Sequence, residues 1–115
     1  MNFIIIQTKL YGVEYSSKDT ETVVIPNEVT EITDYSFSGS SCSNKIKKVI
    51  IPSSVTKIGR KAFFNCKNLE EVILPENITI DDTAFSDCKN LKSIKTAWNL
   101  LKLKKFKNNI TALQM

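Results

Sequence analysis

The chain has 115 residues and a net charge of +4, a length that suits one folded domain. No apolar run approaches the roughly 20 residues that cross a bilayer, and the N-terminus lacks the basic segment and apolar core of a secretory signal. The sequence alone therefore favours a cytoplasmic location. Histidine is absent, and no nucleophile motif or glycine-rich phosphate loop occurs, so we expect neither enzyme activity nor a metal or cofactor.

The first elements are predicted to be short strands. Phe3–Leu10, Tyr11–Tyr15 and Glu21–Ile25 are rich in β-branched and aromatic residues, and the polar segment Ser16–Asp19 is typical of a turn. Residues 1–21 are therefore expected to form a β-hairpin cap. Such a cap covers apolar surface that the first unit of a repeat array would otherwise expose.

Two tandem copies of one pattern follow. Ile46–Asn68 reads IKKVIIPSSVTKIGRKAFFNCKN, and Leu69–Asn90 reads LEEVILPENITIDDTAFSDCKN. Residues 22–45 form a looser first copy, so the predicted repeats are 22–45, 46–68 and 69–90. A period of 20–29 residues with aliphatic residues at fixed offsets indicates a leucine-rich-repeat solenoid. We expect a single mostly β domain of about three to four repeats.

Residues 91–115 are open to two interpretations. They form either a worn repeat with a last strand or an amphipathic capping helix, because Leu103, Phe106, Ile110 and Leu113 follow helical spacing. Residues 89–115 carry seven lysines and no acidic residue. A basic tail with interleaved aromatics can dock on an anionic polymer or membrane, but a solvated cap explains it equally well. Without arginine or a nucleic-acid motif in this stretch, we expect no nucleic-acid partner.

The pattern L-x-x-V-x-I-P-x-x-V-T-x-I-G-x-x-A-F-x-x-C-x-N resembles the BspA-type leucine-rich repeat. Its residues here are Val49–Pro52, Ser54–Thr56, Ile58-Gly59, Ala62-Phe63 and Cys66. The resemblance implies a right-handed solenoid in the α/β horseshoe class with a parallel concave sheet. It also implies recognition of proteins or cell surfaces rather than catalysis, and a surface or secreted location.

Several positions carry specific expectations. The phenylalanines Phe37, Phe63 and Phe85 should stack in one file, and Gly59 is predicted to adopt positive φ. Cys42, Cys66 and Cys88 share one offset and are expected to be equivalent small thiols in a crowded slot. An odd number of cysteines does not indicate a disulfide framework, and their spacing does not fit a zinc site.

The outward positions of the predicted concave sheet form the candidate protein-binding site. One column is Val24, Ile50, Ile73 and Lys95; the other is Thr22, Lys48, Glu71 and Ser93. The apolar column is either a ladder that favours strand formation or the centre of a binding face. The main hypothesis is a non-catalytic interaction or adhesion module that binds a protein through this face. The alternatives are a truncated, mainly structural array that self-associates through its open C-terminal edge, or docking of the basic tail.

Overall fold

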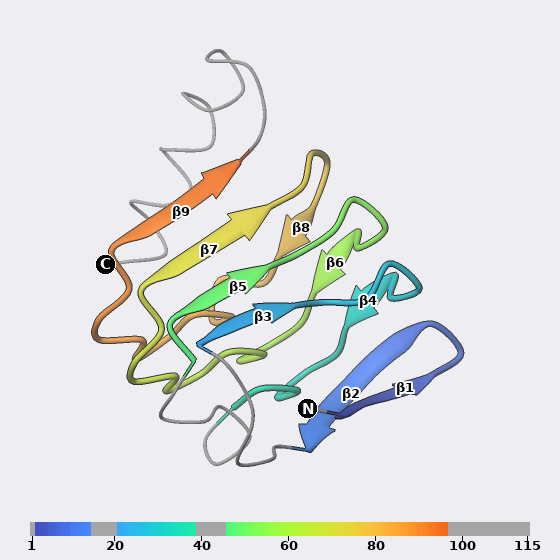
Figure 1. Ribbon diagram of the computed structural model, residues 1–115, viewed down its shortest axis with the longest axis horizontal. Helices are drawn as coiled ribbons and strands as arrows, with labels where there is room; N and C mark the ends of the chain where they lie inside the picture. Colours follow the sequence, from blue (N-terminus) through green and yellow to red (C-terminus); the bar gives the residue numbers. More distant parts are fainter. Residues whose placement is uncertain (1, 15–20, 39–45, 97–115) are drawn as a thin grey trace.

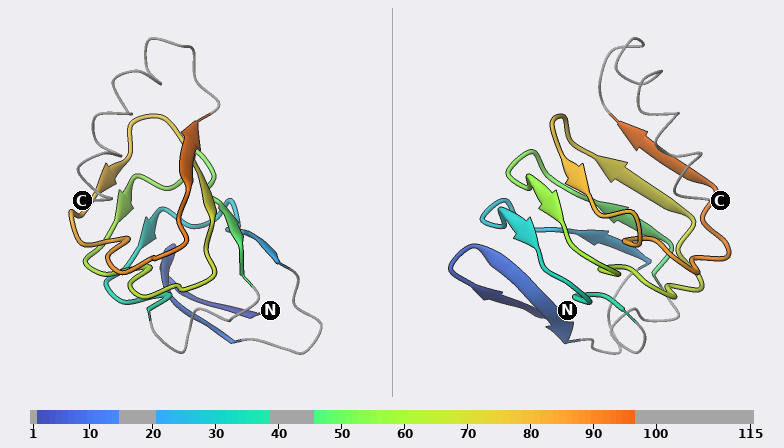
Figure 2. Two further views of the ribbon diagram at one scale, coloured as in Figure 1. Left: turned by 90° about the vertical axis from the view of Figure 1, so that its left-hand side faces the viewer. Right: turned by 180° about the vertical axis from the view of Figure 1, so that it is seen from behind.

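The computed structural model describes residues 2–14, 21–38 and 46–96. These segments form nine strands and, among the described residues, no helix. The strands lie in two sheets, one of four strands and one of five, with successive turns of the chain stacked on each other (Figures 1 and 2). The predicted mostly β solenoid with a parallel sheet is confirmed.

The four-stranded sheet is parallel throughout and takes one strand from each turn. Its strands are β3 (Thr22–Val24), β5 (Lys48–Ile50), β7 (Glu71–Leu74) and β9 (Ser93–Thr96). The register aligns Val23 with Val49, Val49 with Val72, and Val72 with Ile94. Equivalent repeat positions therefore lie side by side, and β3, β5 and β7 are each followed, directly or one residue later, by the repeat's proline, which has no N–H to extend the ladder.

The five-stranded sheet was not predicted. Its short parallel strands are β4 (Glu31–Ile32), β6 (Lys57–Ile58) and β8 (Thr79–Ile80), and the N-terminal β2 (Lys9–Glu14) and β1 (Asn2–Ile6) complete it. Ile32, Ile58 and Ile80 stand in register, so each turn stacks an isoleucine on its neighbour. Strands of two residues are too short to produce an alternating sequence pattern.

The N-terminal hairpin exists, but its two strands are not the predicted ones. The predicted turn, Ser16–Asp19, lies outside the described residues. Gln7 and Thr8 have φ of 49° and 67°, and they turn the chain within the segment predicted as one strand, Phe3–Leu10. β1 pairs antiparallel with β2, while the segment predicted as the later hairpin strand, Glu21–Ile25, contains β3 of the other sheet. A two-residue hairpin turn with positive φ at both positions usually contains glycine or asparagine. Gln7 and Thr8 are neither, so the composition of this segment did not indicate a turn.

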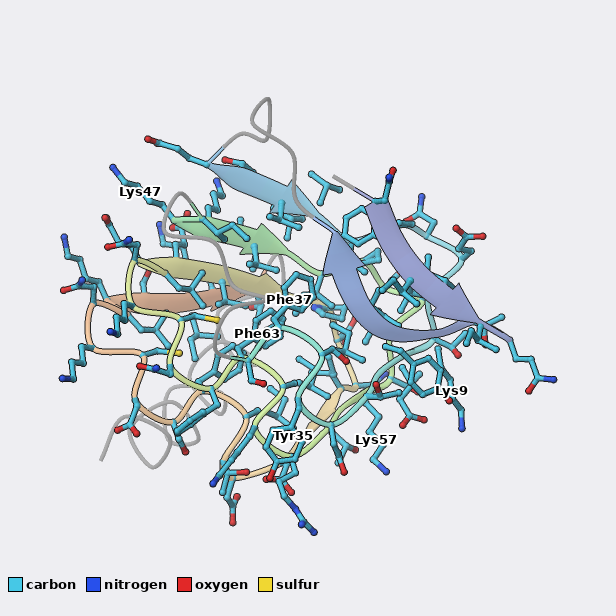
Figure 3. The ribbon with its side chains drawn as sticks, turned by 90° about the horizontal axis from the view of Figure 1, so that it is seen from below. Lys9, Tyr35, Phe37, Lys47, Lys57 and Phe63 are labelled. Carbon is cyan, nitrogen blue, oxygen red and sulfur yellow. The ribbon has the colours of Figure 1, made fainter. Side chains whose placement is uncertain are left out.

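The core lies between the two sheets. Phe37 and Phe63 stack with ring centroids 4.8 Å apart, and Phe63 and Phe85 stack at 5.2 Å, which confirms the predicted file. Figure 3 shows Phe37 and Phe63 adjacent inside the molecule, whereas Lys9, Lys57 and Tyr35 point outward. The residues before the three rings, Ser36, Ala62 and Ala84, are all small and buried.

Gly59 does not adopt the predicted positive φ; the left-handed residue of that turn is Lys61, with φ of 50°. The glycine is needed for space instead. A Cβ at Gly59 would lie 2.8 Å from the backbone nitrogen of Asp34 in the preceding turn and against the Asp34 carboxylate. That carboxylate accepts a hydrogen bond from the Arg60 N–H at 2.7 Å, which holds the two turns together.

The expectation of three equivalent thiols was wrong for Cys66, which is disulfide-bonded and fully buried. Cys88 carries a free thiol, which donates to the Phe63 carbonyl oxygen at 3.0 Å. Cys42 lies outside the described residues.

Candidate protein-binding face

The candidate face is the outward side of the four-stranded sheet. The strand register aligns Val24 with Ile50, Ile50 with Ile73, and Ile73 with Lys95. A second column beside it consists, in register, of Thr22, Lys48, Glu71 and Ser93. The structure therefore brings all eight predicted residues together on one surface.

The first column forms an apolar stripe. Val24 is 59% exposed, and Ile50 and Ile73 are half-buried. Their neighbours in sequence, Val23 and Val49, point inward and are buried, because strand side chains alternate between the two faces. The stripe therefore lies on the face of the sheet that points away from the core.

The polar column is organised around Glu71. Its carboxylate lies 3.3 Å from the Lys48 ammonium and 2.7 Å from the Lys95 ammonium. The hydrogen bond from Lys95, followed by that from Lys48, lowers the pKa of Glu71 below its ordinary value, against the opposing effect of desolvation. Two ammonium groups share one carboxylate, so the set keeps one positive charge. Lys95 is the more exposed of the two, with 61% of its side chain accessible.

The pair between Lys48 and Glu71 follows from their adjacent places in the predicted column, but the diagonal pair between Lys95 and Glu71 was missed. Lys95 lies opposite Ile73 rather than Glu71. Diagonal neighbours in a sheet lie within reach of long side chains, and this rule would have found the contact once the register was known. The diagonal bond joins the end of the apolar stripe to the polar column.

A second exposed apolar cluster lies on the N-terminal hairpin, and sequence reasoning missed it because the turn was misplaced. Ile4, Ile6 and Tyr11 are 42%, 57% and 49% exposed. Ile6 pairs with Lys9, and the Lys9 ammonium lies 3.8 Å from Glu31 of the next strand in that sheet. This hairpin cluster is the natural competitor to the four-stranded face in any binding experiment.

Other chemically interesting groups have structural partners. Burial raises the pKa of the Cys88 thiol to about 11, which makes it a poor nucleophile at neutral pH. The Asp81 carboxylate accepts hydrogen bonds from the hydroxyl and backbone N–H of Thr83, which lower its pKa. Within residues 2–14, 21–38 and 46–96, no group of three His, Cys, Asp or Glu side chains is placed to hold a metal ion. Lys92 and Lys95, the first lysines of the predicted basic tail, are described and pair with Glu70 and Glu71. Residues 97–115, with the rest of that tail and the predicted C-terminal edge, lie outside the described residues.

A stack of equivalent turns, each contributing one strand to a parallel sheet, defines a solenoid repeat protein. The sequence profile described as BspA type Leucine rich repeat region (6 copies) matches residues 8–113. The chain belongs to the BspA-type leucine-rich-repeat family. Repeat solenoids of this kind generally serve in binding rather than catalysis.

Among solved structures, the chain is similar to a leucine rich cell surface protein from Faecalibacterium prausnitzii A2-165, with a TM-score of 0.36 and 20% identity. The match covers 91% of this chain and 37% of that one. No curated protein matches the chain. The described residues contain no helix long and apolar enough to cross a membrane.

Proposed function

We propose that the chain is a non-catalytic interaction module that binds a protein partner through the face of β3, β5, β7 and β9. The contact residues of this face are Thr22, Val24, Lys48, Ile50, Glu71, Ile73, Ser93 and Lys95. The proposal places the apolar stripe at the centre of the contact and the charged column at its border. Adhesion to a surface protein is one form that such binding takes in this family.

The observation that supports this proposal is the exposed apolar stripe beside an ordered charged column. A centre of apolar side chains with a polar border is the usual composition of a protein interface. The Glu71 carboxylate is held by two lysines, so the border is largely preorganised before a partner arrives. Preorganised side chains lose less conformational freedom on binding, which favours affinity.

Pull-down with the intact chain, followed by mass spectrometry, would identify the partner, and a double variant tests the face. Ile50→Glu with Ile73→Glu should reduce partner retention at least tenfold, because two carboxylates would be desolvated at the centre of the contact. Both side chains are only half-buried. The cost to folding should therefore stay within about 2 kcal/mol, from lost strand preference and packing.

The matched control is Thr56→Glu with Thr79→Glu, which adds two carboxylates to the same turns at exposed positions near the other sheet. The control should retain the partner. Retention by Ile50→Glu/Ile73→Glu at the wild-type level would overturn the proposal. Loss of retention only with Ile4→Glu/Ile6→Glu would assign binding to the hairpin cluster instead.

A further inference from the structure

The apolar stripe runs across the strands rather than along them. β3, β5, β7 and β9 have only three or four residues each, and the charged column occupies the outward positions next to the stripe. The continuous apolar direction follows the stacking axis through Val24, Ile50 and Ile73. A partner that uses the whole stripe must therefore present apolar groups at the spacing of the strands.

This spacing discriminates between regular peptide conformations. Adjacent strands are about 4.8 Å apart, so the three steps from Val24 to Lys95 span about 14 Å. Three turns of an α-helix rise about 16 Å, which leaves a mismatch of about 2 Å that side chains can absorb. An extended segment presents alternate residues about 6.6 Å apart, so three steps span about 20 Å and overshoot by about 6 Å.

The charge at the end of the stripe adds a requirement. Lys95 continues the apolar column in register, and its side chain is 61% exposed. Its ammonium shares Glu71 with Lys48, which leaves one positive charge of the set without a matching carboxylate. A carboxylate on the partner, one turn beyond three apolar residues, would complete this pairing.

We propose that the partner element is an amphipathic α-helix lying across β3, β5, β7 and β9. When the helix runs from β3 to β9, its apolar residues at i, i+4 and i+7 contact Val24, Ile50 and Ile73, and an Asp or Glu at i+11 pairs with Lys95. When it runs the other way, the acidic residue is at i and the apolar residues are at i+4, i+7 and i+11. This inference rests on the proposed function, because it names the kind of partner for the same face. In this position, each turn of the helix contacts one strand of the sheet through one side chain.

Two peptide display libraries selected against the full-length chain test the proposal. One library displays peptides constrained to a helix and randomised along one face, and the other displays unconstrained peptides that contain proline and adopt extended conformations. Each library is first depleted on Ile50→Glu/Ile73→Glu protein, which removes the peptides that bind without using the stripe. We expect the helical library to yield binders with apolar residues at three successive turns and an acidic residue one turn further.

A charge test on the selected helix then examines the end of the stripe. Lys95→Gln should weaken binding of that helix about threefold to tenfold, and changing its acidic residue to Gln should weaken binding similarly. Combining both changes should cost little more than either alone, because the same pair is removed. Lys57→Gln, in the other sheet, is the control and should leave binding unchanged. Fully additive effects would overturn the assignment of Lys95.

The outcomes separate this inference from the proposed function. If only the extended library yields binders that depend on Ile50 and Ile73, the helix is wrong and the face remains the binding site. If a partner from pull-down is retained by Ile50→Glu/Ile73→Glu protein and neither library yields a binder that survives the depletion, the proposed function and the helix fail together.

Discussion

Truncation of the central ring in the phenylalanine file should be more costly than truncation of an end ring. Phe63 is fully buried and stacks on Phe37 at 4.8 Å and on Phe85 at 5.2 Å. Stacked aromatic pairs contribute about 0.5–1.5 kcal/mol each beyond the area they bury. Phe63→Leu removes both pairs while keeping most of the apolar volume, so its stacking loss is about 1–3 kcal/mol. Phe85→Leu removes one pair, for a loss of about 0.5–1.5 kcal/mol.

Urea unfolding followed by far-UV circular dichroism would measure these differences at equilibrium. Phe63→Ala adds the loss of burial and should cost about 3–5 kcal/mol, a large part of the stability of a small domain. Val55→Ala is the control, because Val55 is equally buried but stacks on no ring. If Phe63→Leu costs no more than Phe85→Leu, the file contributes burial alone, and the argument from ring stacking is refuted.

Three further changes probe local features of the structure. Gly59→Ala should destabilise the chain by about 1–3 kcal/mol, because its Cβ would press on the Asp34 backbone, whereas Gly12→Ala should cost less, since its Cβ would meet nothing closer than 3.6 Å; thermal unfolding compares the two. The lowered pKa of Glu71 means that its carboxylate stabilises the fold fully above about pH 4.5, and this contribution is lost as the pH falls through the lower folded-state pKa. Wild-type protein should therefore lose more stability than Glu71→Gln between about pH 6 and pH 3, and parallel stability curves would contradict this. The Cys88 thiol, with a pKa of about 11, should react with iodoacetamide at neutral pH much more slowly in folded than in unfolded protein, and equal rates would show that it is not protected.

The sequence predicted those parts of the fold that repetition determines. Tandem copies imply that equivalent residues stack, which placed Phe63 on Phe85 and Ile50 beside Ile73 before any coordinates were known. The same logic located the eight outward positions of the candidate face. The N-terminal segment lies outside the repeat, so no second copy of it indicated its structure. The hairpin turn at Gln7 and Thr8 was therefore misplaced.

Contacts that depend on the exact approach of two turns could not be predicted. The requirement for glycine at position 59 arises from the Asp34 backbone in the preceding turn, not from the local dihedral angle of the glycine. The bond between Lys95 and Glu71 crosses the sheet diagonally, and only the register reveals it. Sequence periodicity predicts the order in which the turns stack. Predicting these contacts also requires the distance and the rotation between adjacent turns.

The attachment of the hairpin has a consequence for how the chain opens. β2 pairs with β4, so the first turn is anchored along the five-stranded sheet, whereas among the described strands β3 has a neighbour on one side only, namely β5. Local fraying of the first turn should therefore begin at β3, and amide hydrogens there should exchange with solvent sooner than those of β5. Val24 lies on this edge strand, so a ligand bound to it would hold the strand in place and slow the hydrogen exchange of the first turn.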